Sequence, residues 1–527
     1  MIELYDATLR DGMQGQGMSL SAAEKVRVAH RLDALGIHAI EAGFPASNPK
    51  ERELYALLEA EPVAHAQVAA FGMTCRAGVP AEEDEALRLL AGLWAPATTI
   101  VGKTWGLHLD KVVRVSRDEN LDMIASSVAF LRAAGKRVVY DAEHFFDAFR
   151  DDPGYALACV GAAAGAGADV VCLCDTNGSS LPGQVAAATA SVADAVDVVV
   201  GFHGHDDCGC GVANALAAVE AGARHVQGTM NGVGERTGNT NLTTVIANLQ
   251  LKLGLEVLPP DRLAGLTDAA HFVDELLNRT PDPQQPYVGK AAFAHKGGLH
   301  VAGVNADPAT FEHVDPAAVG NHRELLVSEL SGRGTLLARE DLDAPTAARV
   351  VERVKELEHR GFQFEAADGS LDLLVRREQG TYEPLFRLES WRVISEKRED
   401  GSVETEATIK IWADGERYVS TAEGNGPVNA LDRALREAIA ARHPHLRDIR
   451  LVNYKVRILD EQQATGATTR VLLDATDGHD TWGAIGVHEN VIEASWDALV
   501  DSLEAGMLRS RSPEAPAART AVDQGAS

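Results

Sequence analysis

Short apolar runs alternate with alanine-rich amphipathic stretches through the first half of the chain. Segments such as 21–36 and 211–223 have apolar residues at i, i+3, i+4 and i+7 and end at glycine or one residue beyond it, which is typical of amphipathic helices. The apolar runs lie at residues 2–9, 38–44, 67–72, 98–103, 137–144, 169–176, 198–205 and 225–232. Eight strand-then-helix units in about 250 residues predict a (β/α)₈ barrel, although an open doubly wound sheet has the same local pattern.

Polar residues decide between these two architectures. A barrel requires its chemistry at the carboxyl ends of the strands. The runs end in such residues, at Arg10–Asp11, Glu143–His144, Asp175–Thr176, His203–Asp206 and the polar stretch 231–241. We therefore predict an α/β fold with a TIM-barrel catalytic domain at residues 1–270.

The alternation of strands and helices stops after the barrel. Residues 271–380 contain helical stretches interrupted at 281–290 and 296–303, and we predict helical linker subdomains there. Long polar strands then appear within residues 381–508. They predict a C-terminal α+β domain of a binding or regulatory kind.

The C-terminal domain has an internal duplication. Residues 414–439 and 477–503 share a DG turn, a strand, a glycine-bearing loop and an amphipathic helix. The last residues, 509–527, are rich in Pro, Ser and Ala, and we predict a disordered tail.

Composition narrows the class of protein. The 527 residues are enough for two or three domains, and a formal charge of −28 argues against binding to nucleic acid. Six cysteines without paired CxxC spacing argue against a disulfide framework. The sequence shows no secretory signal and no membrane-spanning run, so we expect a cytoplasmic protein without a membrane partner.

The stretch GFHGHDDCGCG at residues 201–211 has three interpretations: a pair of metal ligands, a structural zinc knot that uses Cys208 and Cys210, or two core histidines. Because side chains alternate along a strand, His203 and His205 point the same way. Asp11 ends the first strand, which lies close to the seventh in a closed barrel. One carboxylate and two imidazoles suit Zn²⁺, Mn²⁺ or Fe²⁺, whereas a zinc knot favours spaced cysteine pairs.

Four colinear motifs resemble the α-isopropylmalate synthase and homocitrate synthase family. They are DATLRDGMQGQG (6–17), GFHGHDDCG (201–209), NGVGERTGNTNL (231–242) and AFAHKGGLHV (292–301). Further stretches, among them YDAEHFFD, LCDTNG and AEGNGPVNALDRAL, are similar to the citramalate synthase branch of that family. The similarity extends over about residues 1–508.

The resemblance implies roles for eight residues. A divalent metal ion, Mn²⁺, Zn²⁺ or Mg²⁺, is expected on Asp11, His203, His205 and Asn239. Arg10 is expected to bind substrate and stabilise developing negative charge, and Thr176 to bind the substrate carboxylate or cap a strand end. Glu143 is expected to be the base, and His300 to assist enolisation or protonate the thioester carbonyl.

The resemblance also implies the reaction. We expect acetyl-CoA, as co-substrate, to condense with pyruvate and water to (R)-citramalate and CoA, the first step of a threonine-independent isoleucine pathway. A homodimer with isoleucine as effector of the C-terminal domain is expected by the same analogy. Three alternatives stay open: a 2-isopropylmalate synthase or another 2-oxo acid synthase, a lyase or aldolase of the same barrel family, and a metal-bound amino-acid sensor without catalysis.

Overall fold

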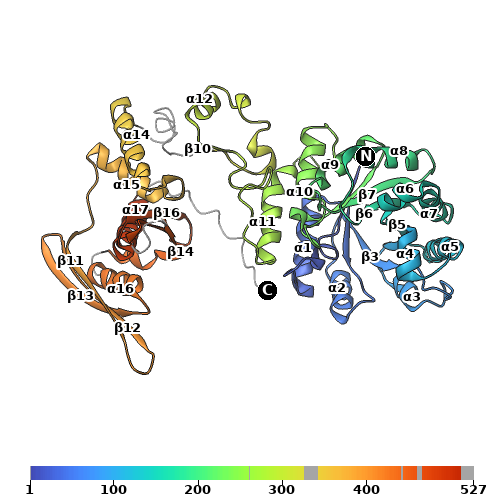
Figure 1. Cartoon of the computed structure of the whole chain (residues 1–527), viewed down its shortest axis with the longest axis horizontal. Helices are drawn as coiled ribbons and strands as arrows, with labels where there is room; N and C mark the ends of the chain where they lie inside the picture. Colours follow the sequence, from blue (N-terminus) through green and yellow to red (C-terminus); the bar gives the residue numbers. More distant parts are fainter. Residues whose placement is uncertain (1, 260, 326–341, 441–442, 460–465, 512–527) are drawn as a thin grey trace, which may run out of the picture. The chain divides into compact units, whose positions relative to one another are not determined.

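The computed structural model describes residues 2–259, 261–325, 342–440, 443–459 and 466–511 (Figure 1). The chain divides into two compact units. The first consists of Met1–Phe293 with Glu312–Arg323, and the second of Ala294–Phe311 with Glu324–Ser527.

Eight parallel strands close into a barrel in the first unit, in chain order, because β1 pairs with both β2 and β8 (Figure 1). The strands are β1 Glu3–Asp6, β2 Ala39–Gly43, β3 Gln67–Met73, β4 Ala97–Lys103, β5 Arg137–Glu143, β6 Val170–Asp175, β7 Val199–Gly204 and β8 His225–Gly228. The closed barrel confirms the prediction and excludes the open sheet.

Helices follow the strands and cover the barrel. They are α1 Ala22–Leu35, α2 Pro49–Ala60, α3 Glu85–Gly92, α4 Gly106–His108, α5 Arg117–Ala133, α6 Phe145–Asp151, α7 Pro153–Gly165, α8 Pro182–Ala193, α9 Gly211–Glu220, α10 Leu242–Leu251 and α11 Leu266–Leu276. Helix α1 shows how particular residues set the two ends of a helix. A capping box between Ser21 and Glu24 begins α1, and Gly36, at a φ of 99°, ends it.

Side chains alternate along each strand between two environments, the core under the helices and the barrel lumen. Outward residues such as Leu4 and Ile40 join the large core between the strands and the helices. Inward residues near the amino ends of β2, β3 and β4 are small: Ala39, Ala69 and Ala97 pack on Tyr5 in the lumen. The polar side chains of the site lie further along the same inward face.

Two predicted strands end three or more residues before the expected position. The first ends at Asp6 rather than at residue 9, because the backbone N–H groups of Arg10, Asp11 and Gly12 turn back onto the carbonyl oxygen of Ala7 at 3.1, 2.9 and 3.1 Å. The run 225–232 is a strand only to Gly228, and a 3-10 turn follows. Asp11 therefore lies on a tight turn after its strand.

The second unit begins with a short pair of parallel strands, β9 Ala294–His295 and β10 Glu324–Leu325. The α-helices described in this unit before the C-terminal sheets are α12 Gly298–Ala306, α14 Ala344–His359 and α15 Asp368–Gln379. Helix α14 packs through Val350, Val351 and Val354 against Leu371 and Leu374 of α15.

Two antiparallel three-stranded sheets, each followed by a helix, form the C-terminal part of the described chain. The first repeat is β11 Arg387–Lys397, β12 Val403–Ala413, β13 Glu416–Gly424 and α16 Pro427–Ile439, and the second is β14 Arg450–Ile458, β15 Thr469–Thr476, β16 Thr481–His488 and α17 Val491–Arg511. The predicted duplication is confirmed. Its shared core contains Ile409 and Leu435 from the first repeat and Leu473 and Leu499 from the second.

The end of the chain differs in part from the prediction of a disordered tail at 509–527. Residues 509–511 belong to α17, whose end is held where Arg509 donates to Asp368 at 2.8 Å and to Asp372 at 3.0 Å. Residues 512–527 lie outside the described residues. None of the helices that the structure describes has the length and apolar character needed to span a bilayer.

Candidate metal centre and active site

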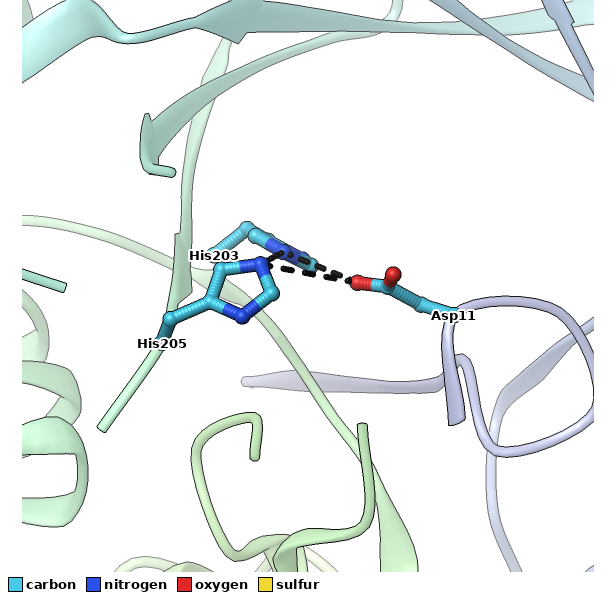
Figure 2. A group of neighbouring side chains, drawn as sticks. All are labelled: Asp11, His203 and His205. Carbon is cyan, nitrogen blue, oxygen red and sulfur yellow. Dashed lines mark hydrogen bonds and ion pairs between the residues drawn. The ribbon is translucent and has the colours of Figure 1, made fainter. Parts of the chain in front are cut away.

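Asp11, His203 and His205 converge at the carboxyl end of the barrel strands (Figure 2). Oδ2 of Asp11 lies 3.3 Å from Nε2 of His203 and 3.8 Å from Nε2 of His205. The two Nε2 atoms are 3.5 Å apart. All three residues are buried, so three candidate ligand atoms from two distant segments face one small volume.

The arrangement follows from the strand geometry of β7. His203 and the residue just after the strand, His205, both face the lumen, while Gly204 faces outward. A Cβ at Gly204 would lie 2.6 Å from the ring of Phe202, which belongs to the outer core. Glycine is therefore required at position 204 to leave room for the ring of Phe202 on the same strand.

Asn239 lies beside His205, because their backbones form an isolated antiparallel bridge. Its side chain is buried, and its Nδ2 donates to the carbonyl oxygen of Val233 at 3.2 Å. Its Oδ1 is buried without a hydrogen-bond partner. A buried amide oxygen without a partner, on a residue whose backbone pairs with that of His205, is a candidate fourth ligand.

The donor set fits a divalent cation. Burial opposes ionisation of Asp11, but Arg10, His203 and His205 together hold the pKa of its carboxyl well below the usual range. Burial, and then the charge of His203, lowers the pKa of His205 to about 4, so its ring is neutral and can donate a lone pair. A carboxylate, two imidazoles and an amide oxygen suit Zn²⁺, Mn²⁺ or Fe²⁺.

Arg10 is fixed beside the candidate metal centre. Its Nε donates to Glu41, which is fully buried on β2, and its Nη1 lies 3.3 Å from Oδ1 of Asp11. The guanidinium also lies 3.8 Å from the ring centre of Phe71. Tyr5 donates to the other oxygen of Glu41 at 2.6 Å. A positive charge held on three sides is preorganised for developing negative charge.

Glu143 ends β5 at the same rim and forms an ion pair with Lys103, the last residue of β4. A second group of candidate ligand atoms, from His108, Glu143 and His144, lies around this pair. The hydroxyl oxygen of Thr176 accepts from the backbone N–H of His144 at 3.0 Å. Thr176 therefore serves as a local cap, and its hydroxyl hydrogen is left for another acceptor.

His300 belongs to the second unit. It lies exposed on α12, and its ring stacks on Phe311 with ring centres 4.1 Å apart. Of the eight predicted residues it is the one that lies outside the barrel unit.

The two cysteines that follow the histidines lie away from the candidate ligand atoms. Cys208 is exposed, and its Sγ lies 3.5 Å from the carbonyl oxygen of Ser180. Cys210 is the N-cap residue of α9. Neither joins the candidate metal-ligand groups found among the described residues.

Sequence reasoning missed Glu41, Lys103 and Gln227. Lys103 ends the fourth apolar run, so the rule of polar strand ends, applied to that run, would have found it. Glu41 and Gln227 are polar residues inside apolar runs, on the same inward parity as the lumen residues. A polar residue at an inward-facing position of an apolar run was the signal by which the sequence could have identified them.

Comparisons with known proteins agree with this architecture. Residues 1–273 match the HMGL-like family, residues 287–361 the homocitrate synthase post-HMGL domain-like family, and residues 365–507 the LeuA allosteric (dimerisation) domain.

Several relatives match over nearly the whole chain, among them the following three. An (R)-citramalate synthase of Streptomyces coelicolor is 49% identical over 515 residues, covering 96% of each chain. An (R)-citramalate synthase of Geobacter sulfurreducens is 44% identical over 522 residues, covering 98% of this chain and 99% of the relative. A probable 2-isopropylmalate synthase of Methanopyrus kandleri is 33% identical over 510 residues, covering 95% and 97%.

The resemblance expected from the sequence motifs is thereby confirmed. The chain belongs to the HMGL-like family and, within it, to the group of (R)-citramalate synthases.

Proposed function

We propose that this protein is an acyltransferase that condenses acetyl-CoA with pyruvate and water, giving (R)-citramalate and CoA. The observation that carries the proposal is the convergence of Asp11, His203 and His205 beside Arg10, in a chain 49% identical to an (R)-citramalate synthase. Asn239 completes the proposed metal-ligand set, supported by its orphaned Oδ1. A divalent ion, when bound there, acts as a Lewis acid for the keto oxygen and as a template for the 2-oxo acid.

Arg10 has a stabilising role in this proposal. When the acetyl carbon attacks the ketone of pyruvate, negative charge develops on the former keto oxygen. The guanidinium of Arg10, held by Glu41 and stacked on Phe71, is oriented before the substrate arrives. Preorganised charge of this kind costs no reorganisation during the reaction.

Glu143 is the proposed base that removes a proton from the acetyl methyl group. Lys103 holds its carboxylate at the strand end. His300 is proposed to assist enolisation or protonate the thioester carbonyl, and Thr176 to donate its free hydroxyl hydrogen to the substrate carboxylate. Water then cleaves the thioester of the condensation product, releasing CoA as the thiol. This step needs neither a cysteine nor a serine nucleophile.

The remaining domains have regulatory and structural roles in the proposal. We assign the catalytic barrel to residues 1–270, a connecting region that supplies His300 to residues 271–380, and regulation to residues 381–508. A homodimer is supported by the match of residues 365–507 to the LeuA allosteric (dimerisation) domain. Isoleucine is the proposed effector if the product leads to isoleucine.

The test is turnover of the purified protein with acetyl-CoA and a panel of acceptors, followed as released CoA thiol. The panel contains pyruvate, 2-oxoisovalerate and 2-oxoglutarate, each with and without a metal chelator. We expect pyruvate to be preferred and the chelator to abolish turnover. Preference for 2-oxoisovalerate would instead indicate a 2-isopropylmalate synthase. Isoleucine binding without turnover of any acceptor would indicate a sensor, and cleavage of citramalyl-CoA without condensation would indicate a lyase.

A further inference from the structure

A chain of hydrogen bonds crosses the barrel lumen from His203 to the amino end of β1. Nδ1 of His203 lies 3.0 Å from Oε1 of Gln227, and Nε2 of Gln227 lies 3.3 Å from Nε2 of His225. Nδ1 of His225 lies 2.7 Å from Oε2 of Glu3, which Arg137 holds through two hydrogen bonds of 2.6 and 2.7 Å. Gln227 and His225 have no solvent exposure. Because these two side chains are shielded from solvent, their donors must face acceptors within the protein.

Glu3 determines which atoms donate and which accept in this chain of hydrogen bonds. Burial opposes its ionisation, but the hydrogen bonds from His225 and Arg137 lower the pKa of Glu3 to about 2. Glu3 is therefore a carboxylate under ordinary conditions, and a carboxylate only accepts. Nδ1 of His225 must then carry the hydrogen, and its Nε2 can accept from the amide nitrogen of Gln227.

The amide of Gln227 is oriented by two acceptors. Its Nε2 lies 2.9 Å from Oδ1 of Asp141 as well as 3.3 Å from Nε2 of His225. Both amide hydrogens are used in this orientation, and the carbonyl oxygen faces Nδ1 of His203. Turning the amide over would place its oxygen against the lone pair of His225 and lose that bond.

We propose that Gln227 is a positioning residue that fixes the tautomer and the ring angle of His203. Its carbonyl oxygen accepts the Nδ1 hydrogen of His203, so Nε2, which lies 3.3 Å from Oδ2 of Asp11, is the ring nitrogen left to bind a metal ion. A partner on the second ring nitrogen is what orients histidine ligands in metal sites generally. Here the partner is a neutral amide, whose own orientation is set from the opposite end of the barrel by Glu3 and His225. The inference rests on the metal centre of the proposed function.

The test compares Mn²⁺ affinity, measured without substrates, in the wild-type protein and in Gln227→Met. Methionine has a similar volume but neither accepts from His203 nor donates to Asp141, so we expect binding about 10- to 100-fold weaker. Because the ligands themselves remain, kcat at saturating Mn²⁺ should stay within about threefold of wild type. Thr98→Val is the control: Thr98 is buried on β4 with an unpartnered hydroxyl, and the loss of this hydroxyl should leave Mn²⁺ affinity unchanged.

The Gln227→Glu variant distinguishes a loss of these hydrogen bonds from a folding defect in Gln227→Met. A glutamic acid side chain that keeps its proton can donate to Asp141 and still accept from His203, so its Mn²⁺ affinity should exceed that of Gln227→Met. Equal affinity in wild type, Gln227→Met and Gln227→Glu would overturn the inference. Absence of stoichiometric Mn²⁺, Zn²⁺ or Mg²⁺ binding by the wild type would instead overturn the proposed metal centre, so the two failures are distinguishable.

Discussion

Glu41→Gln is the perturbation that most directly tests how Arg10 is held. Glu41 lies on β2 with no solvent exposure, and its two carboxylate oxygens accept from Arg10 and from Tyr5. Glutamine keeps the shape of the side chain but removes the negative charge. Arg10 then retains Asp11, at 3.3 Å, as an anionic partner.

The expected loss of stability is about 3 kcal/mol. Removing one member of a buried ion pair costs about 3–5 kcal/mol. The low end of this range applies because Asp11 still neutralises part of the charge of Arg10. The amide of the introduced glutamine can also still form a hydrogen bond with Tyr5. A looser guanidinium should also lower kcat/KM about 100-fold, equivalent to about 2.7 kcal/mol of transition-state stabilisation.

Hydrogen exchange of amides in β2, followed by mass spectrometry, measures the stability change locally in this two-unit chain. A loss of about 3 kcal/mol makes globally protected amides exchange about 150-fold faster. The control is Asp268→Asn, which removes an ion pair between Arg31 and Asp268 whose side chains are 38% and 68% exposed. Exposed pairs contribute about 0–1 kcal/mol. Similar exchange rates in both variants, or an unchanged kcat/KM in Glu41→Gln, would refute the reasoning.

Three further predictions follow from single contacts. In Gly234→Ala, at a φ of +155°, the new Cβ would lie 2.1 Å from Nδ2 of Asn239. Mn²⁺ binding in a dialysis assay should therefore weaken about 10-fold or more. The control Gly17→Ala is also at positive φ, but its Cβ would have no atom within 4 Å, so Mn²⁺ binding should not weaken. The pKa of Glu3 is lowered to about 2 from 4.5, so its stabilising contribution is present above pH 4.5 and is lost as pH falls toward 2. Urea midpoints of wild type and Glu3→Gln should therefore converge over that interval, and a constant difference would contradict the assignment. Glu143→Gln should lower kcat about 10²- to 10⁴-fold in the CoA-release assay while the KM for pyruvate changes little, whereas parallel changes in both would argue against a base.

The fold was predictable because its signal is local and repeated. Eight apolar runs with polar ends are enough to specify a closed barrel, and the alternation along a strand pairs His203 with His205. The end of β1 was not predictable from hydrophobicity, because residues 7–9 are as apolar as a strand requires. A tight turn onto the carbonyl oxygen of Ala7 decides it, and that turn depends on tertiary contacts.

The sequence predicted most residues of the candidate site that lie at or just after strand ends, but not those inside the strands. Asp11 and the two histidines stand at strand ends, where position along the chain indicates position at the rim. Glu41 and Gln227 act from within strands, and their partners, Arg10 and His203, come from other segments of the chain. Alternation along the strand indicates that Glu41 and Gln227 face the lumen, but a single sequence does not indicate which distant residue each of them contacts.

The most direct measurement of the central claim is anomalous diffraction from crystals of the protein grown with Mn²⁺ or Zn²⁺. We predict one strong anomalous peak at coordination distance, about 2.0–2.2 Å for zinc, from Asp11, His203, His205 and Oδ1 of Asn239. A peak at the group formed by His108, Glu143 and His144 instead, with none between Asp11 and His203, would contradict the account.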